Sequence, residues 1–299
     1  MNIIGKRNLY FLISFLVIIP GLISLLFFGL RLSIDFTGGT RLSFSAQKPI
    51  DDKTTEAMKD VFKKESVEVS TVQRSENRIF FRTTTIDQKK YAKIVEGFKK
   101  IGNYKEENYE TVGPVVGQET TIKAIQSIVI ASILIVLYIA WSFRHVPKPA
   151  SSFRFGICAI IALLHDVLLV IGIFSLLGHF FHVEVDSLFV TAILTIIGFS
   201  VHDTIVVFDR LRENLRRMSN APFETVANES ILQTLGRSLN TSLTVFLVLF
   251  TLLLFGGEST KWFIVALLVG IISGTYSSIF NASPLLVVWE EWSRKRLKK

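Results

Sequence analysis

Six long stretches of apolar residues restrict this chain to one class of fold. A helix rises 1.5 Å per residue, so about 20 residues span the roughly 30 Å hydrocarbon layer of a bilayer. Six segments of sufficient length are predicted to be membrane-spanning helices, at Leu9–Leu30, Ile125–Phe143, Phe155–Gly178, Leu188–Phe208, Leu239–Gly257 and Trp262–Trp289. The sequence therefore predicts an all-α, multi-pass six-helix bundle in contact with the lipid bilayer.

The basic residues explain the net charge of +8 and predict the orientation. They flank the apolar segments instead of forming a basic face, so we exclude nucleic-acid binding. One set of short segments carries Lys6, Arg7, Arg144, Lys148, Arg154, Arg210, Arg212, Arg216, Arg217, Arg237, Arg294, Lys295, Arg296, Lys298 and Lys299. The opposite short loops, 179–187 and 258–261, contain a single lysine, Lys261, and no arginine. The positive-inside rule then predicts that both termini are cytoplasmic.

The first apolar segment is predicted to be an uncleaved anchor. Its apolar core is longer than that of a signal peptide, and no small-x-small cleavage site follows it. The predicted organisation is a first helix at 1–30, an extracytoplasmic domain at 31–121 and a five-helix domain at 122–299. Segment 222–236 is expected to be a short amphipathic helix at the cytoplasmic interface, separate from the fifth span.

Segment 31–121 has the pattern of a folded α+β domain. Alternating residues predict strands near Arg41–Ser45, Glu68–Arg74 and Arg78–Thr84, with a last strand near Tyr104–Val112. Two amphipathic helices are expected, one capped by Asp51 or Asp52 and one starting near Asp87. The order β-α-β-β-α-β is the ferredoxin-like pattern.

Motifs for chemistry are missing from the sequence. There is no phosphate-binding loop, no G-x-S-x-G nucleophile elbow and no H-E-x-x-H helix. Cys158 lies inside an apolar segment and is expected to be an inert, small apolar residue. We predict no catalytic residue, no cofactor and no metal site, so any work must draw on an ion gradient or a partner.

Asp203 is the polar residue of greatest interest, because an ionised carboxylate is costly inside a membrane helix. His202 and Thr204 flank it, and Ser200 is the one polar residue on the same helical face. One interpretation is a carboxylate that binds and releases a proton. The other is a static salt bridge, and the sequence leaves both open.

Arg237 is the candidate partner of Asp203. It begins the fifth apolar segment and is followed by a polar run at Asn240, Thr241, Ser242 and Thr244. Such a run is expected to face a bundle interior or a wet crevice. The alternative is an interfacial arginine whose side chain reaches the lipid headgroups.

Two further features lie within predicted spans. His165 and Asp166 are adjacent in the third span, where they suit either proton transfer or a fixed hydrogen-bonded pair. The sixth span carries small residues four apart, at Ala266, Gly270, Gly274, Ser278 and Ala282. This seam indicates close helix packing, against a helix that the sequence does not identify.

Several motifs, in the same order along nearly the whole chain, resemble the SecF family, which belongs to the RND transporter superfamily. They are Asp35-Phe36-Thr37-Gly38-Gly39, Val112-Gly113-Pro114-x-Val116-Gly117, Ala162-x-x-His165-Asp166-Val167, the run from Gly198 through Asp203-Thr204 to Asp209-Arg210-x-Arg212-Glu213-Asn214, and Arg237-Ser238-x-x-Thr241-Ser242. The fourth motif is the most specific. His202 stands where Asn is common in the family.

The resemblance implies a function that the residues alone do not. SecF proteins are accessory subunits of the Sec protein-export machinery in the bacterial inner membrane. They pair with SecD beside the SecYEG channel, often with YajC, and use the proton-motive force to help pull a translocating preprotein outward. By resemblance, Asp203 and Arg237 match positions tied to proton transport, whereas Asp166 carries no defined role.

Residues and resemblance together suggest that Asp203 alternates between a neutral form and an anion paired with Arg237. His165, Asp166 and His202 are further candidates for the proton pathway. Two rival functions remain open. One is an RND-type exporter half for a small molecule or lipid, and the other is a translocon scaffold that uses no energy.

Overall fold

The protein, seen here as a computed structural model, is described for residues 1–47, 49–75, 77–144, 146–147 and 151–297. Lys148, Lys298 and Lys299, which contributed to the predicted orientation, lie outside these ranges. The chain forms two compact units, Met1–Arg31 with Gln126–Lys299, and Leu32–Ile125. We call them the transmembrane unit and the α+β unit; the sequence placed the corresponding boundaries a few residues earlier.

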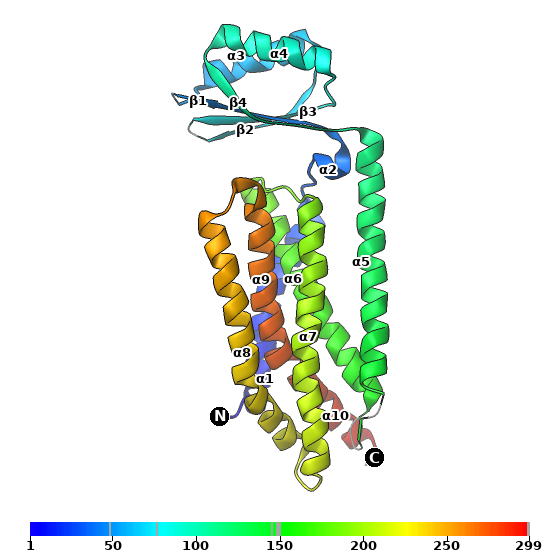
Figure 1. Cartoon of the computed structure of the whole chain (residues 1–299). Helices are drawn as coiled ribbons and strands as arrows, with labels where there is room; N and C mark the ends of the chain where they lie inside the picture. Colours follow the sequence, from blue (N-terminus) through cyan, green and yellow to red (C-terminus); the bar gives the residue numbers. More distant parts are fainter. Residues whose placement is uncertain (48, 76, 145, 148–150, 298–299) are drawn as a thin grey trace. The chain divides into compact units, whose positions relative to one another are not determined.

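The prediction of six membrane-spanning helices is confirmed, because six helices are long and apolar enough to cross a bilayer. Their elements are η1 (Ile4–Lys6) with α1 (Arg7–Phe28), α5 (Pro114–Ser142), α6 (Ser152–Phe181), α7 (Ser187–Arg217), α8 (Phe223–Phe255), and η2 (Glu258–Thr260) with α9 (Lys261–Ser277), η3 (Ser278–Ala282) and α10 (Ser283–Leu297). Within the transmembrane unit, α9 packs against α6, α7 and α8, and α1 packs against α6 (Figure 1). The sequence of α9 is apolar and small on most sides, which suits this enclosed position.

The predicted separate helix at 222–236 is wrong. These residues form the first turns of α8, which runs without a break from Phe223 to Phe255. The amide of Asn214, near the end of α7, donates to Ser230 and Gln233 on α8, both at 2.9 Å. The side chains of Phe223 and Ile231 are buried as well. This packing stabilises both helices beyond the ends of their apolar stretches. A prediction from hydropathy places the helix ends at the ends of those stretches and therefore makes both helices too short.

The sixth span is also not one regular helix. A π turn at Ser278–Ala282 separates α9 from α10. Below this turn, the carboxylate of Glu290, which is only 3% exposed, pairs with Arg154 of α6. Glu291 accepts two hydrogen bonds from Arg7, at 2.9 and 3.0 Å. These pairs attach α10 to α6 and to the start of α1.

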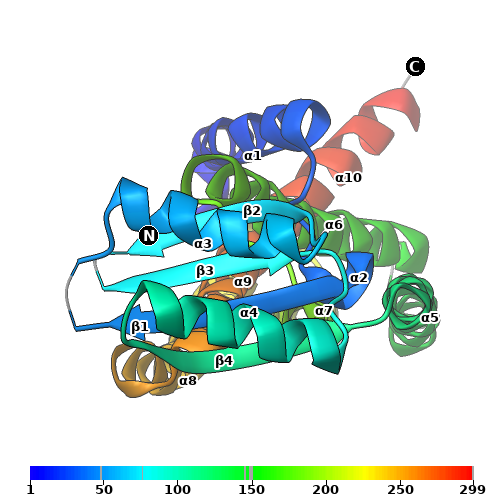
Figure 2. The same cartoon turned by 90° about the horizontal axis from the view of Figure 1, so that it is seen from above.

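The α+β unit has the predicted element order, with one short extra helix, α2 (Ile34–Thr37), before the first strand. The elements are β1 (Gly39–Ala46), α3 (Asp52–Lys64), β2 (Val69–Ser75), β3 (Arg78–Thr83), α4 (Gln88–Ile101) and β4 (Tyr104–Val112). The strands form an antiparallel sheet in the order β2-β3-β1-β4. Both main helices lie side by side on one face of this sheet (Figure 2).

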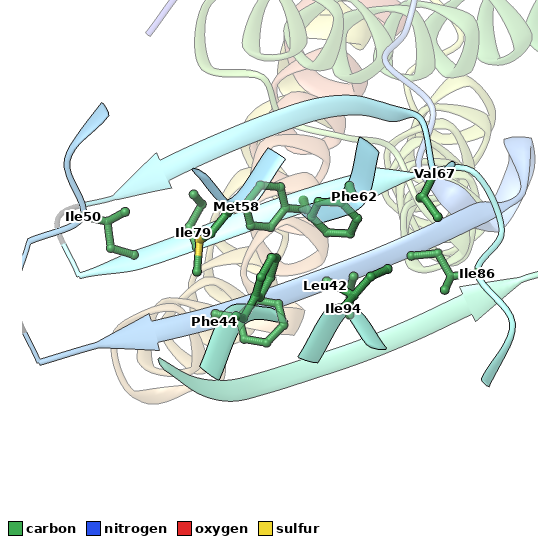
Figure 3. Packing of buried hydrophobic residues seen from close by; sticks show 11 residues of the cluster. Leu42, Phe44, Ile50, Met58, Phe62, Val67, Ile79, Ile86 and Ile94 are labelled. Atoms are coloured by element: carbon green, nitrogen blue, oxygen red, sulfur yellow. The ribbon is translucent and has the colours of Figure 1, made fainter. Parts of the chain in front are cut away.

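Local chemistry starts both helices, and aromatic packing holds them on the sheet. The carboxylates of Asp51 and Asp87 accept hydrogen bonds from backbone N–H groups three residues later, at 2.8 and 2.7 Å. Side chains from sheet and helices point toward one another in the core (Figure 3). Phe98 contacts Phe44 and Phe62 edge to face, at ring-centre distances of 4.8 and 5.4 Å.

The glycine pair Gly38-Gly39 lies between α2 and β1, where larger residues would not fit. Both residues have positive φ, 72° and 124°. A Cβ atom on Gly38 would lie 2.8 Å from Cα of Pro114, and one on Gly39 would lie 2.6 Å from the carbonyl oxygen of Thr83. The pair therefore lets the chain pass close to both the start of α5 and the end of β3.

Tyr91 gives the α+β unit a measurable pH dependence. Its hydroxyl donates to the carboxylate of Glu106 on β4. Partial burial and this acceptor disfavour the phenolate and raise the pKa of Tyr91 from 10 to about 12. Since the folded state holds the proton more tightly, the contribution of Tyr91 to stability is full below pH 10 and is lost as the pH rises towards 12.

We predict that the ultraviolet difference titration of the wild type against Tyr91→Phe will show one tyrosine ionising near pH 12. The stability difference between the two proteins should shrink over the same pH range. A difference titration centred at the ordinary tyrosine pKa of about 10 would contradict the contact with Glu106.

Candidate functional site

The transmembrane unit buries two aspartates on neighbouring helices. Asp166 of α6 is 0% exposed and Asp203 of α7 is 2% exposed. Among the described residues, no lysine or arginine lies within ion-pairing distance of either carboxylate. Burying a carboxyl group without such a cation is costly unless hydrogen bonds compensate, so the donors around each group determine what it can do.

Asp166 is held by four hydrogen bonds. Its Oδ2 accepts from the hydroxyls of Ser200 and Ser277, both at 2.6 Å. Its Oδ1 accepts from the hydroxyl of Ser273 at 2.6 Å and lies 3.0 Å from Nδ1 of His165. The donors come from α6, α7 and α9, so this carboxylate joins three helices at one point.

Asp203 has much weaker support. Its Oδ2 accepts one long hydrogen bond, 3.5 Å, from the hydroxyl of Thr275 on α9. The same hydroxyl lies 2.5 Å from that of Ser242 on α8. Thr275 of α9 and Ser242 of α8 are therefore the two hydroxyl groups beside Asp203, and they connect α7 to both helices.

One short stretch of α9 donates hydrogen bonds to both aspartates, from opposite sides of the helix. Successive helical residues turn by about 100°, so Ser273 and Ser277 share a side, and Thr275 between them faces away. The first pair contacts Asp166 and the threonine contacts Asp203. A displacement of α9 at this level would change both environments together.

Small residues make this arrangement possible. A Cβ atom on Gly270 would lie 2.3 Å from the side chain of Ile196, and one on Gly274 would lie 3.2 Å from Cβ of Ser200. The seam on α9 therefore packs against α7 of the same chain, which identifies the partner helix that the sequence left open. Its other members are Ala266, Ser278 and Ala282, which are all fully buried. The close approach brings short serine side chains within reach of Asp166.

Arg237, the candidate partner of Asp203, forms no ion pair with it in the structure, a point that the sequence left open. Arg237 is exposed on α8, and its side chain has no ion pair among the described residues. Ser200, which the sequence placed on the same helical face as Asp203, is buried like it, but its hydroxyl donates to Asp166. His202 is exposed, on a side of α7 that leads away from the buried Asp203.

Sequence reasoning missed the hydroxyl donors Ser273, Thr275 and Ser277, and it missed the buried Glu290. Serine and threonine are common in membrane helices, where they usually bond their own backbone. The alternation Ser273-x-Thr275-x-Ser277 was the available signal. Its meaning depends on which helix lies on each side, and periodicity does not reveal this.

Taken together, the fold and the site define a multi-pass membrane unit with a polar interior, the architecture of a membrane transport component. In the described part of the chain, no group of three or more His, Cys, Asp or Glu side chains could hold a metal ion.

The family model for the protein export membrane protein SecD/SecF, C-terminal, matches residues 90–292, and the model of the SecD/SecF GG motif matches residues 23–50. The chain belongs to the SecD/SecF family of protein export membrane proteins. The second match contains Gly38-Gly39, whose positive φ angles and close backbone contacts explain why the motif requires glycine.

Full-length relatives support this membership. The protein translocase subunit SecF of Thermobaculum terrenum is 50% identical, over 97% of this chain and 94% of the relative. The protein translocase subunit SecDF of Bacillus subtilis is 36% identical, but the match covers 99% of this chain and 38% of that longer protein.

A solved structure shows the same fold. The crystal structure of SecDF from Thermus thermophilus, described as a translocon-associated membrane protein, superposes with a TM-score of 0.84 and 31% identity. The match covers 97% of this chain and 39% of that chain. The transmembrane unit is therefore an RND-like half, and the chain is a multi-pass membrane protein of protein transport.

A larger side chain at position 274 should disturb the surroundings of both aspartates. In Gly274→Val, the added atoms would press on Ser200 and on Asp166 Oδ2, which is 3.7 Å from the Cβ position. We expect α9 to move away from α7 and the free energy of unfolding to fall by about 1–3 kcal/mol. Thermal unfolding in detergent measures this. Gly236→Val is the matched control, because nothing lies within 4 Å of its Cβ position. Equal losses in both variants would contradict the packing described.

Proposed function

We propose that this chain is an accessory subunit of the Sec protein-export translocase and that it uses the proton-motive force, together with SecD, to complete protein translocation. Family membership supports the export role. One observation carries the proton-driven part: Asp203 is buried in a membrane helix beside the hydroxyls of Thr275 and Ser242, and no lysine or arginine of the described residues lies within ion-pairing distance.

The difference between the two aspartates assigns their roles. Asp166 accepts three short hydrogen bonds from serines of α7 and α9 and is also hydrogen-bonded to His165, so a change at this group must break several contacts at once. The hydrogen bond that Asp203 accepts from Thr275 is 3.5 Å long, so gaining or losing a proton there disturbs fewer short hydrogen bonds than at Asp166. A buried carboxyl group with so little support is inexpensive only when it is neutral. Asp203 is therefore the proton-binding group of the proposal, and Asp166 with His165 joins the helices around it.

Arg237 completes the cycle. In this proposal a neutral Asp203 does not attract Arg237, which agrees with the exposed position of Arg237 on α8. Once Asp203 loses its proton, the anion attracts Arg237 and favours a different packing of α7 against α8. A proton that crosses 100 mV supplies about 2.3 kcal/mol, which suits a stepwise shift between two packings.

The proposed mechanism requires SecD as a partner. His202 of α7 and Arg237 and Asn240 of α8 are exposed within spanning helices. Polar side chains at such depth favour protein neighbours over lipid. We infer that this face of α7 and α8 packs against helices of SecD. The long SecDF relatives support the pairing, because in them a SecF-like chain is part of one polypeptide.

The remaining parts follow from the predicted orientation. We propose that both termini face the cytoplasm of a bacterial inner membrane. The α+β unit is then an extracytoplasmic, ferredoxin-like domain, which holds the outer domain of SecD or the emerging preprotein. SecYEG, and YajC where present, complete the assembly beside the membrane unit.

Removing the charge of Asp203 tests the proposal. In Asp203→Asn, export in inverted membrane vesicles should lose its dependence on the proton gradient, because an amide cannot exchange a proton. SecD should still co-purify, because the substitution is close in shape. Asp209→Asn is the control, since Asp209 is exposed at the end of α7 and pairs with Arg212 at 2.5 Å. Retention of gradient dependence in Asp203→Asn would sink the motor mechanism and favour a scaffold.

Arg237 should act through its charge. We expect Arg237→Ala to remove most gradient-dependent export and Arg237→Lys to retain part of it, because lysine keeps the cation without the planar fork. Arg216→Ala serves as the control, since Arg216 is an exposed arginine near the end of α7. Export that is equal in Arg237→Ala and Arg216→Ala would show that Arg237 only snorkels at the interface.

A further inference from the structure

The sheet of the α+β unit has two outer strands of different composition. The order β2-β3-β1-β4 makes β2 and β4 the outer strands, as Figure 2 shows. In the described part of the chain, each of them pairs along one side, β2 with β3 and β4 with β1. An outer strand turns every second backbone N–H and C=O group away from the sheet, where another chain can pair with them.

Strand β4 carries the charged side chains that natural proteins use to prevent such pairing. Its nine residues include Lys105, Glu106, Glu107 and Glu110. Glu107 also forms an ion pair with Arg78 of β3, at 3.2 Å. A chain that added to this edge would have to displace these charges or desolvate them. The β4 edge is therefore protected against strand addition.

Strand β2 lacks this protection. Among its seven residues, Val69–Ser75, the one ionisable side chain is that of Arg74, and Asp52 of α3 already pairs with it at 2.5 Å. Most of the other residues are valine, serine and threonine, and valine and threonine favour extended backbone. A bulge interrupts the pairing after Val69, but residues 71–75 pair with β3 one by one. This stretch offers a short, regular and nearly uncharged edge.

An open groove of about 490 Å³ lies beside this edge. Lys59 and Lys63 of α3 line it on one side, and residues 67–72 line it on the other. The side chain of Val72 is half-buried against the core and contributes apolar surface. Lys59 is paired with Glu56 at 2.7 Å, whereas Lys63 is exposed and has no ion pair among the described residues. The groove thus accepts aliphatic side chains and offers one cation to an acidic side chain.

The edge and the groove together fit an extended polypeptide. In strand addition, hydrogen bonds of the main chain supply the affinity, and pockets beside the edge receive alternate side chains. Recognition through the main chain depends little on sequence. A folded protein keeps most of its strands paired, whereas an unfolded chain has its N–H and C=O groups available. A protein export component meets chains of many sequences, and this mode of binding suits all of them.

We propose that the edge of β2, with the groove beside α3, binds an extended segment of the exported chain as a fifth strand of the sheet. The inference rests on the proposed function, because it takes the exported chain as the ligand and places the α+β unit on the outer side of the membrane. The regular edge is short, so it holds a segment weakly and releases it as the chain advances.

Two cysteine variants test the choice of edge, Ser70→Cys on β2 and Asn108→Cys on β4. Both positions are exposed, and the native Cys158 is buried. Each variant is the full chain, co-expressed with its SecD in inverted membrane vesicles. The probe is a precursor with one cysteine and a tightly folded C-terminal domain that stalls its export. Under mild oxidation, two or more main-chain hydrogen bonds should raise the disulfide yield at position 70 roughly fivefold or more above that at position 108.

Proline in the precursor separates strand addition from other contacts in the groove. Proline has no backbone N–H, so prolines at alternate positions of the stalled segment remove main-chain donors. One such hydrogen bond is worth roughly two- to tenfold in binding, so two prolines should lower the yield at position 70 about fourfold or more. Alanines at the same positions are the control and should keep the yield. A yield that prolines leave unchanged would contradict strand addition.

The other outcomes separate this inference from the function beneath it. Equal yields at positions 70 and 108 would overturn the choice of edge. A cross-link from position 70 to SecD, or to a second copy of this chain, would overturn the choice of ligand. If Asp203→Asn abolishes gradient dependence and position 70 gives no cross-link, the strand edge is wrong and the proton motor stands. If Asp203→Asn has no effect while position 70 is cross-linked to the precursor, the motor fails and the strand edge stands.

Discussion

Two carboxylates in a membrane bundle need hydrogen-bond donors, and one stretch of α9 supplies donors to both. Ser273 and Ser277 donate to Asp166, while Thr275 between them donates to Asp203. Lipid provides neither water nor counter-ions, so this stretch must stay enclosed by α6, α7 and α8. The glycines at 270 and 274 follow from the same need, because short hydroxyl side chains reach their acceptors only when helices pack closely.

The hydrogen bonds of the two aspartates differ in number and length, so the helix packing is more constrained around Asp166 than around Asp203. The hydrogen bonds of Asp166 join three helices, and the adjacent Glu290 and Glu291 in the middle of α10 attach the lower part of the sixth span to α6 and α1. Asp203 lies between these fixed contacts and the outward-facing Arg237, with one long hydrogen bond. A bundle that is rigid around one carboxylate and loose around the other can change its packing locally, without coming apart.

The α+β unit depends on a different constraint, the close packing of its core. Its aromatic residues join two helices to one face of the sheet, and the glycine pair lets β1 and the start of α5 approach each other. Neither feature involves catalytic chemistry.

Hydropathy by itself determined the six spans, because a helix must be apolar along about 20 residues to cross a bilayer. Alternation and capping residues likewise determined the order of helices and strands at 39–112, since these signals are local. Asp203, Asp166 and the small-residue seam were visible as costly or unusual residues in apolar segments. Only the tertiary structure decided that Ser200 serves Asp166, that Arg237 faces outward, that α8 begins at Phe223 and that a π turn divides the sixth span. The physical reason is that the sequence around a hydroxyl or a guanidinium group does not show which group it will bond. Which group it meets depends on how closely and at what level two helices pack.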